Sequence, residues 1–264
     1  MLRSVSVHLE LEILGATNMV FSMTPALGAI VASERLEFTL DGKPQEFREI
    51  VDLHGTRLQN FVTERGSLAV DYALEIGGKA TTEPINEVDL ITYLRPSRYA
   101  QSDSLTPFAR SLFSGLSGYT LVQAVTDWVF ENVSYVSGSS LPTDGATRTL
   151  LSRQGVCRDF AHVTIALLRA MEIPARMVSV YAPGLSPMDF HAVAEAYVDG
   201  TWWVIDSSRL APRQSLIRIA TGRDAADTAW LTSTWTDLNV MSMLVTVSAD
   251  ALPFDSHYDK VQLA

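Results

Sequence analysis

Hydrophobic and polar residues alternate in three stretches of the first hundred positions, which is the pattern of a β-strand with one buried face. The stretches cover residues 5–13, 36–40 and 68–76, and the last two run into the turn sequences Asp41-Gly42 and Gly77-Gly78. Short alternating strands separated by turns are typical of an antiparallel β-sandwich. We therefore predict a β-sandwich domain over residues 1–100.

The alternation is lost between residues 95 and 107, and helical spacing follows it. Hydrophobic residues recur on one helical face over residues 121–129, which predicts a helix that ends near Asn132. A second short helix is expected over residues 146–153. Because β-rich runs follow these helices, we predict a second, α+β domain over residues 101–264.

A third helix is expected to begin at or near Cys157 and to end before Ile173-Pro174, because proline disfavours a helical residue before it. Its inner stripe is predicted to consist of Phe160, Thr164, Leu167, Leu168 and Met171. The hydrophobic run 238–247 is expected to be a strand that completes the sheet of this second domain.

Composition fits a globular protein, since 47% of the 264 residues are hydrophobic and 19% are charged. The net charge is −10, and no basic run stands out, so we expect neither a nucleic acid nor an anionic membrane surface as a partner. The chain starts without a basic stretch and apolar block, and its longest mostly apolar stretch, residues 19–32, is too short to span a bilayer. The expected location is therefore cytoplasmic.

Cys157 is the one cysteine of the chain, which excludes an intramolecular disulfide and a thiolate-rich metal site. At a helix start, the unpaired backbone N–H groups and the helix dipole favour the thiolate form that a nucleophile needs. The alternative interpretation is a small buried hydrophobe, which is the commonest role of a lone cysteine.

Two histidines compete as the base for such a nucleophile. His162 follows Cys157 by five residues, which places it about 140° away around the helix axis, so we interpret it as a core histidine. His191 opens a β-rich run that leads into Asp199-Gly200, a strong hairpin signal. His191 is therefore the favoured base.

The hairpin turn predicts a partner for His191. With Asp199 and Gly200 as the two turn residues, Val193 pairs with Asp206, and Asp206 lies on the same face as His191, diagonally across from it. A register shift of one residue would move Asp206 to the opposite face. The predicted arrangement is a Cys157–His191–Asp206 triad, and the alternative is a buried hairpin whose histidine has only a structural role.

Several segments resemble the transglutaminase-like superfamily of bacterial cysteine proteases: residues 155–162, 169–176, 189–192, 203–206 and 222–227. The resemblance implies a papain-like, transglutaminase-like catalytic core preceded by a β domain. It also implies Cys157 as nucleophile, His191 as base and Asp206 as the residue that orients it. The implied reaction is thiol attack on an amide carbonyl through an acyl-enzyme, followed by hydrolysis or transfer to an amine.

Other residues are candidates for lining the site. The backbone N–H of Cys157 is one oxyanion donor, and either Tyr135 or Gln154 is a candidate for the second. Next to the nucleophile, Asp159 is a candidate for tuning the site. On the hairpin, Glu195 and Trp202 are candidates for lining it.

The leading hypothesis is a cysteine peptidase or amidase that acts on a peptide or protein substrate. The alternatives are a transglutaminase-type acyl transfer to an amine and a binding or scaffold protein without turnover. We expect no cofactor and no metal, since the acidic stretch near Asp224 lacks the spacing of a calcium loop. Substrate identity and oligomeric state stay open at this point.

Overall fold

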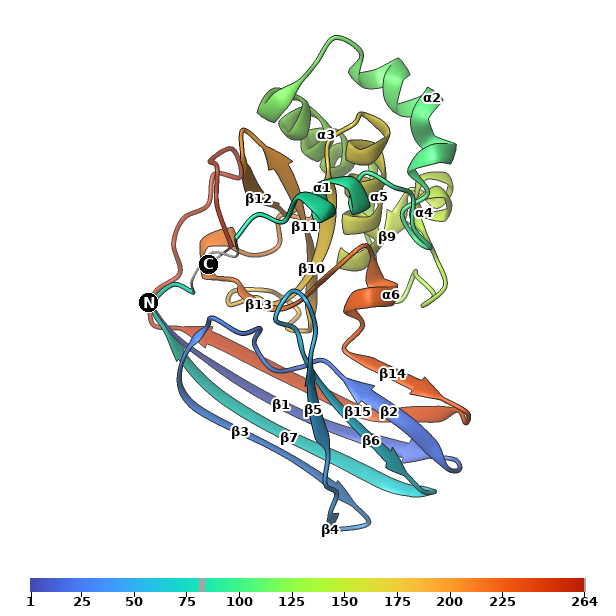
Figure 1. The fold of residues 1–264 in the computed structure, drawn as a ribbon, viewed down its shortest axis with the longest axis vertical. Coiled ribbons are helices and arrows are strands. Elements are labelled where there is room, and N and C mark those ends of the chain that lie inside the picture. Colours follow the sequence, from blue (N-terminus) through green and yellow to red (C-terminus); the bar gives the residue numbers. More distant parts are fainter. Residues whose placement is uncertain (81–83, 264) are drawn as a thin grey trace.

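A β-sandwich and a helix-covered sheet form two layers of the protein (Figure 1). The computed structural model describes residues 1–80 and 84–263. The helices of the described residues are α1 (Glu87–Thr92), α2 (Ser102–Phe113), α3 (Gly118–Asn132), α4 (Ala146–Ser152), α5 (Cys157–Ala170), α6 (Ala225–Thr228) and a 3₁₀ turn (Arg213–Ser215). The strands are β1 (Leu2–Ile13), β2 (Thr17–Phe21), β3 (Ile30–Leu40), β4 (Lys43–Pro44), β5 (Arg48–Val51), β6 (Arg57–Thr63), β7 (Gly66–Gly77), β8 (Ser134–Tyr135), β9 (Gln154–Gly155), β10 (Ala175–Tyr181), β11 (His191–Val198), β12 (Thr201–Ile205), β13 (Ile217–Gly222), β14 (Leu231–Thr234) and β15 (Leu238–Ala249).

The sandwich consists of one sheet in the order β15-β1-β7-β3-β4 and another in the order β14-β2-β6-β5. The three alternating stretches of the sequence form β1, the end of β3 and β7, so the strand predictions are confirmed. Their hydrophobic residues, such as Leu9, Leu11 and Leu68, are fully buried between the two sheets. At the β3–β4 turn, Asp41 and Gly42 both have positive φ angles, 49° and 75°, as the tight turn requires.

The position of β15 corrects one prediction. Residues 238–247 do form a strand, but it pairs with β1 of the sandwich and not with the sheet of the second domain. Val5 pairs with Val247 and Val7 with Val245, so β15 returns to the first strand and these side chains are buried in the sandwich core. The boundary at residue 100 stays a prediction.

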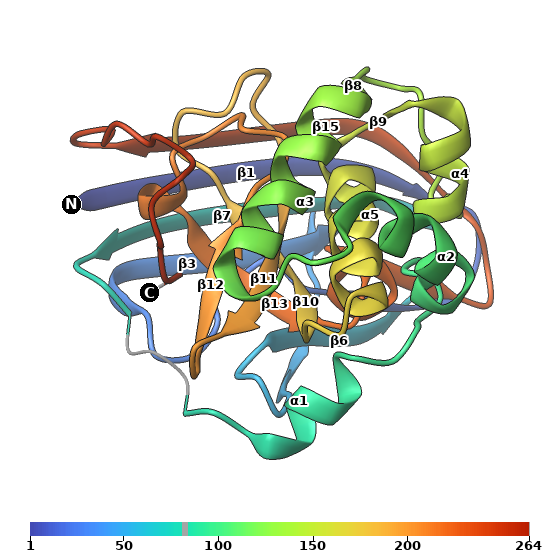
Figure 2. The same ribbon diagram turned by 90° about the horizontal axis from the view of Figure 1, so that it is seen from above.

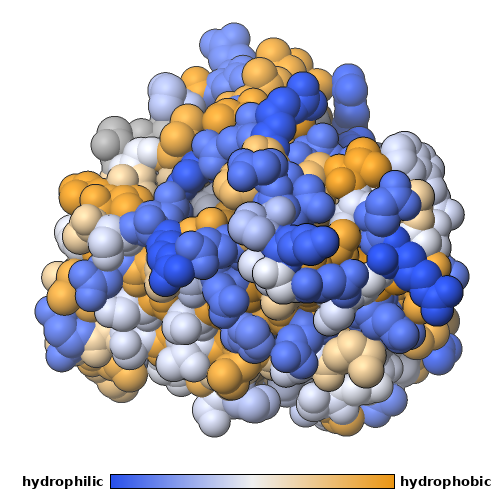
Figure 3. All heavy atoms as spheres, turned by 90° about the horizontal axis from the view of Figure 1, so that it is seen from below, coloured by the Kyte–Doolittle hydropathy of each residue, from blue (hydrophilic) through white to orange (hydrophobic). Residues whose placement is uncertain are grey.

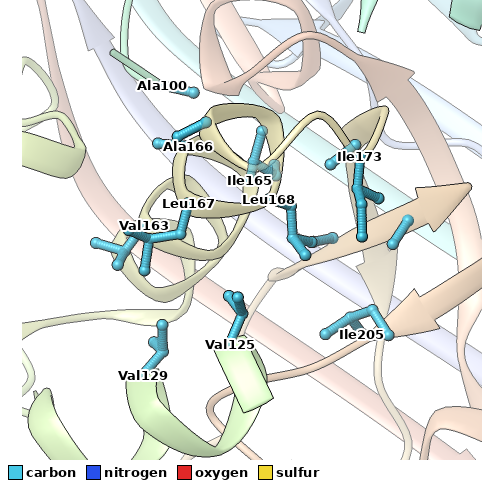
Figure 4. Close-up of a cluster of buried hydrophobic side chains, with 14 of the residues drawn as sticks. Ala100, Val125, Val129, Val163, Ile165, Ala166, Leu167, Leu168, Ile173 and Ile205 are labelled. Carbon is cyan, nitrogen blue, oxygen red and sulfur yellow. The ribbon is translucent and has the colours of Figure 1, made fainter. Parts of the chain in front are cut away.

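The second layer is built around α5. A sheet in the order β12-β11-β10-β13 lies on one side of this helix, and other helices surround it (Figure 2). Leu167 and Leu168 of α5, together with Val125 and Val129 of α3, form the centre of its hydrophobic core (Figure 4). Every residue of α5 from Asp159 to Ala170 is buried, so the predicted inner stripe was too narrow. The helix is enclosed by other elements and does not lie on a surface.

The two layers share hydrophobic contacts. Tyr181 of β10 and Ile217 and Ile219 of β13 pack into the sandwich core. The opposite side of the sandwich, seen from below, carries mostly hydrophilic side chains with smaller hydrophobic patches between them (Figure 3). Among the described residues, none of the helices has the length and apolar character that crossing a bilayer requires.

Candidate active site

Cys157 is the first residue of α5, as the sequence predicts. Its side chain is half-buried, and the thiol donates a long hydrogen bond of 4.0 Å to the backbone oxygen of Phe190, the residue before β11. The helix start and the hairpin therefore meet at the sulfur atom. At this position, the free N–H groups of the first helical turn stabilise a negative charge on the sulfur.

The loop before Cys157 is held by Asp159. One carboxylate oxygen of this buried side chain accepts a hydrogen bond of 2.8 Å from the backbone N–H of Val156, the residue that caps the helix. A Cβ atom on Gly155 would lie 2.6 Å from the Cβ of Asp159, so only glycine leaves room for this contact. Asp159 thus fixes the backbone that carries the nucleophile.

The β11–β12 hairpin has the predicted register. Glu195 pairs with Val204, and the turn residues Asp199 and Gly200 have positive φ angles of 54° and 79°. Nε2 of His191 lies 2.9 Å from Oδ2 of Asp206, and both side chains are almost fully buried. The hairpin register therefore brings this pair together, as the sequence indicated.

Asp206 is held by a residue that the sequence analysis missed. Its second oxygen, Oδ1, accepts hydrogen bonds from the backbone N–H of Ser208, at 2.9 Å, and from the Ser208 hydroxyl, at 2.6 Å. An aspartate side chain often accepts a hydrogen bond from the backbone N–H two residues ahead. The sequence Asp-x-Ser at residues 206–208 could therefore have indicated this contact. The carboxylate is fixed on both sides.

Electrostatics favour a charged His191–Asp206 pair. Burial raises the pKa of Asp206, but the positive charge and hydrogen bond of His191 and the hydrogen bonds of Ser208 outweigh it, so that pKa is lowered. Burial lowers the pKa of His191, but the charge and hydrogen bond of Asp206, together with the neighbouring Cys157, outweigh it, so that pKa is raised. Nδ1 of His191 is buried and has no hydrogen-bond partner among the described residues, so it is the ring nitrogen left to accept a proton from the thiol.

Tyr135 lies near the nucleophile, on β8. This strand pairs in parallel with β9, and Tyr135 is opposite Gly155, two residues before Cys157. Burial, followed by the charge of Cys157, raises the pKa of the Tyr135 hydroxyl to about 12, which keeps it a hydrogen-bond donor at neutral pH. Gln154, the other candidate, is exposed on β9.

Glu195 and Trp202 are not brought to the triad. Glu195 is buried and accepts hydrogen bonds from Arg176, at 2.8 Å, and Arg218, at 2.6 Å. Burial raises the pKa of Glu195, but the two arginines outweigh it and lower that pKa to about 2. The Trp202 ring lies under the Arg176 guanidinium, 4.3 Å from its carbon, and against the edge of Tyr93. These residues stabilise the sheet on the turn side of the hairpin.

His162 is a core residue, as predicted. It is fully buried, accepts a hydrogen bond of 3.1 Å from the backbone N–H of Ala225, and stacks on Tyr99 with ring centres 5.3 Å apart. Burial lowers its pKa to about 3, so the ring is neutral. It joins α5 to α6 and to the chain before α2.

One aromatic contact next to the site was not foreseen. The Phe190 ring, beside the thiol's acceptor, stacks on Trp230, with centres 5.4 Å apart and planes within 6°. The backbone oxygen of Trp230 accepts a hydrogen bond from Ser22 of the sandwich. No local pattern marks this contact, because it depends on how the two layers pack.

No group of three or more His, Cys, Asp or Glu side chains within residues 1–80 and 84–263 has a metal-binding arrangement. The site instead offers a thiol at a helix start, an imidazole beside it, and a carboxylate that holds the imidazole. Thiol, base and orienting acid are the groups used in nucleophilic acyl transfer.

Residues 108–207 match the family model described as the transglutaminase-like superfamily. The crystal structure of a candidate cysteine protease from Cytophaga hutchinsonii is 33% identical, with a TM-score of 0.88, and the similarity covers 98% of this chain and 95% of that one. An uncharacterized protein of Mycobacterium tuberculosis is 28% identical over 206 residues, which cover 72% of this chain and 59% of the relative. One from Mycobacterium leprae is 31% identical over 138 residues, or 46% of this chain and 48% of the relative. The chain therefore spans between about half and three fifths of the length of these mycobacterial relatives.

Proposed function

We propose that this chain, which belongs to the transglutaminase-like superfamily, is a cysteine hydrolase that cleaves peptide or amide bonds through a thioester on Cys157. The observation that carries the proposal is the position of the His191 ring. One of its nitrogens hydrogen-bonds the Asp206 carboxylate, and the ring also interacts with the Cys157 thiol. Helix α5, strand β11 and the residue after β12 supply the three groups, so the tertiary fold is required to assemble them.

The proposed reaction has two steps. The Cys157 thiolate attacks the carbonyl carbon, and His191, which holds the former thiol proton, gives it to the departing amine as the thioester forms. A water molecule then attacks the thioester, loses its proton to His191 and releases the acid, which restores the thiol. Asp206 keeps the His191 ring oriented and stabilises its charged form, with Ser208 fixing the carboxylate.

The oxyanion of each step needs preorganised donors. We assign the backbone N–H of Cys157 as one donor, since the first residue of a helix has no intrahelical acceptor. We assign the Tyr135 hydroxyl as the second donor in preference to Gln154. The charge of Cys157 contributes to the raised pKa of this hydroxyl, which therefore stays protonated at neutral pH and can donate.

A peptide library tests the proposal. The full chain is incubated with a defined mixture of peptides, and mass spectrometry reads the products of the wild type and of the Cys157→Ala and His191→Asn variants. We expect new peptide termini with the wild type only. Equal product formation by Cys157→Ala would refute the proposal, and so would the absence of any product from a library that covers all residue pairs at the cleaved bond.

The same assay separates hydrolysis from transfer. A primary amine added at millimolar concentration would appear in the product mass if the acyl group passes to amines. We expect mainly free acids, because the half-buried thiol at the rim of the fold is open to water. A majority of amide products would instead identify the chain as an acyltransferase.

A further inference from the structure

Asp189 lies on the exposed side of the site, here named the entrance, and has no role in the triad. It is exposed and precedes Phe190, whose backbone oxygen contacts the Cys157 thiol. One carboxylate oxygen accepts a hydrogen bond of 2.6 Å from the Phe190 N–H, which fixes the side chain beside the loop. The nucleophile, its backbone acceptor and this carboxylate are therefore consecutive groups around the entrance.

The carboxylate has no lysine or arginine partner within the described residues. Asp189 forms no ion pair with any Lys or Arg in the part of the chain that the structure describes, residues 1–80 and 84–263. Arg158, the cation nearest to Cys157 along the chain, donates instead to the Ser140 hydroxyl and the Leu141 backbone oxygen, both at 2.8 Å. An acidic side chain without a partner at a catalytic entrance is available to a ligand.

The groups that face Asp189 come from two other elements. Burial raises the pKa of Asp189, while the hydrogen bond from the Phe190 N–H and the positive charge of His191 lower it. Asp189 and His191 therefore interact electrostatically. The negative charges of Cys157 and Asp189 both raise the pKa of the Tyr135 hydroxyl on β8. The carboxylate thus lies within electrostatic range of the reacting groups.

We infer that Asp189 forms a subsite for a positively charged group of the substrate, so that peptides with a Lys or Arg side chain next to the cleaved bond are preferred. The inference rests on the proposed function for the substrate class, but the charge at the entrance can be measured without it. A carboxylate attracts an ammonium or guanidinium group through charge-assisted hydrogen bonds. A glutamate at the same substrate position would be repelled.

The single cysteine makes the local charge measurable. Alkyl methanethiosulfonates react with a thiolate to form a mixed disulfide and release methanesulfinate, so labelling reports on Cys157 alone. The rate with the cationic trimethylammonioethyl reagent is divided by the rate with the anionic sulfonatoethyl reagent. The same ratio for 2-mercaptoethanol corrects for the intrinsic reactivities.

The variants are Asp189→Asn, which keeps the acceptor for the Phe190 N–H, and Glu64→Gln as the matched control. Glu64 lies in the exposed turn between β6 and β7, at the far end of the sandwich (Figure 1). We expect a corrected ratio well above one in the wild type and a decrease of about 25-fold in Asp189→Asn, because one solvated unit charge at close range changes the two rates about fivefold each, in opposite directions. Glu64→Gln should leave the ratio unchanged.

A second measurement tests the substrate class. Peptides that differ only by Arg or Gln beside the cleaved bond give a preference ratio of kcat/KM. This Arg/Gln ratio should exceed one in the wild type, fall about fivefold in Asp189→Asn, and fall below one in Asp189→Lys. An unchanged reagent ratio in Asp189→Asn would refute the subsite. A shifted reagent ratio without turnover of any peptide would leave the charged entrance in place and refute the proposed hydrolase.

Discussion

Glu195 is buried between Arg176 and Arg218, and replacing it with glutamine should destabilise the protein without disabling the site. The substitution removes the charge that balances two arginines, and breaking a buried ion pair by removing one partner typically costs 3–5 kcal/mol. Asp89 remains 3.8 Å from Arg176, and glutamine keeps one acceptor, so we expect the lower end, about 3 kcal/mol. For a chain of this size, that corresponds to a decrease in Tm of about 6–12 °C.

Thermal unfolding followed by circular dichroism measures the effect, with Glu64→Gln as the control for removal of an exposed carboxylate. Glu195 has a folded-state pKa of about 2 against an ordinary value of 4.5. Its stabilisation is therefore complete above pH 4.5 and is lost as the pH falls toward 2. The difference in Tm between wild type and variant should be constant from pH 5 to 8 and shrink below pH 4.5. A variant that melts within 2 °C of the wild type at pH 7 would show that the two arginines do not depend on Glu195.

Three further predictions concern the site. Asp206→Asn should lower kcat by about 10²- to 10⁴-fold in a peptide assay, because the ring of His191 loses the carboxylate that orients and charges it; a loss below tenfold would contradict that role. His191→Asn should slow the alkylation of Cys157 by iodoacetamide at pH 6 by at least tenfold, since a positive charge beside the sulfur favours the thiolate; equal rates would contradict the pairing. Gly155→Ala should lower the free energy of unfolding by about 1–3 kcal/mol, because its Cβ would meet the Asp159 Cβ at 2.6 Å; an unchanged urea midpoint would show that the loop adapts freely.

The arrangement of His191 and Asp206 could be predicted because it depends on local sequence. A two-residue Asp-Gly turn fixes the register of a hairpin, and the register decides which side chains share a face. The helix start at Cys157 could likewise be predicted from the sequence, since hydrophobic residues at helical spacing begin there. The contact between Ser208 and Asp206 could also have been predicted locally, because an aspartate side chain often accepts a hydrogen bond from the backbone N–H two residues ahead.

The missed features depend on contacts between distant segments. The alternation within β15 indicates a strand, but nothing in it specifies β1 as its partner. A helical stripe identifies the most apolar side of α5, yet helices cover its other sides as well, so every residue from Asp159 to Ala170 is buried. Glu195 is opposite Arg176 on the neighbouring strand, and a pattern along one strand does not reveal its cross-strand charges.

A thioester on Cys157 is the central claim, and intact-mass spectrometry of an acid-quenched reaction tests it most directly. Wild-type protein mixed with a peptide or activated amide substrate for milliseconds to seconds should gain the mass of the acyl group, and peptide mapping should place it on Cys157. Treatment with neutral hydroxylamine should remove it, as expected of a thioester, and Cys157→Ala should gain nothing. Product formation without any acyl adduct, or an adduct on another residue, would contradict the assignment of Cys157 as the nucleophile.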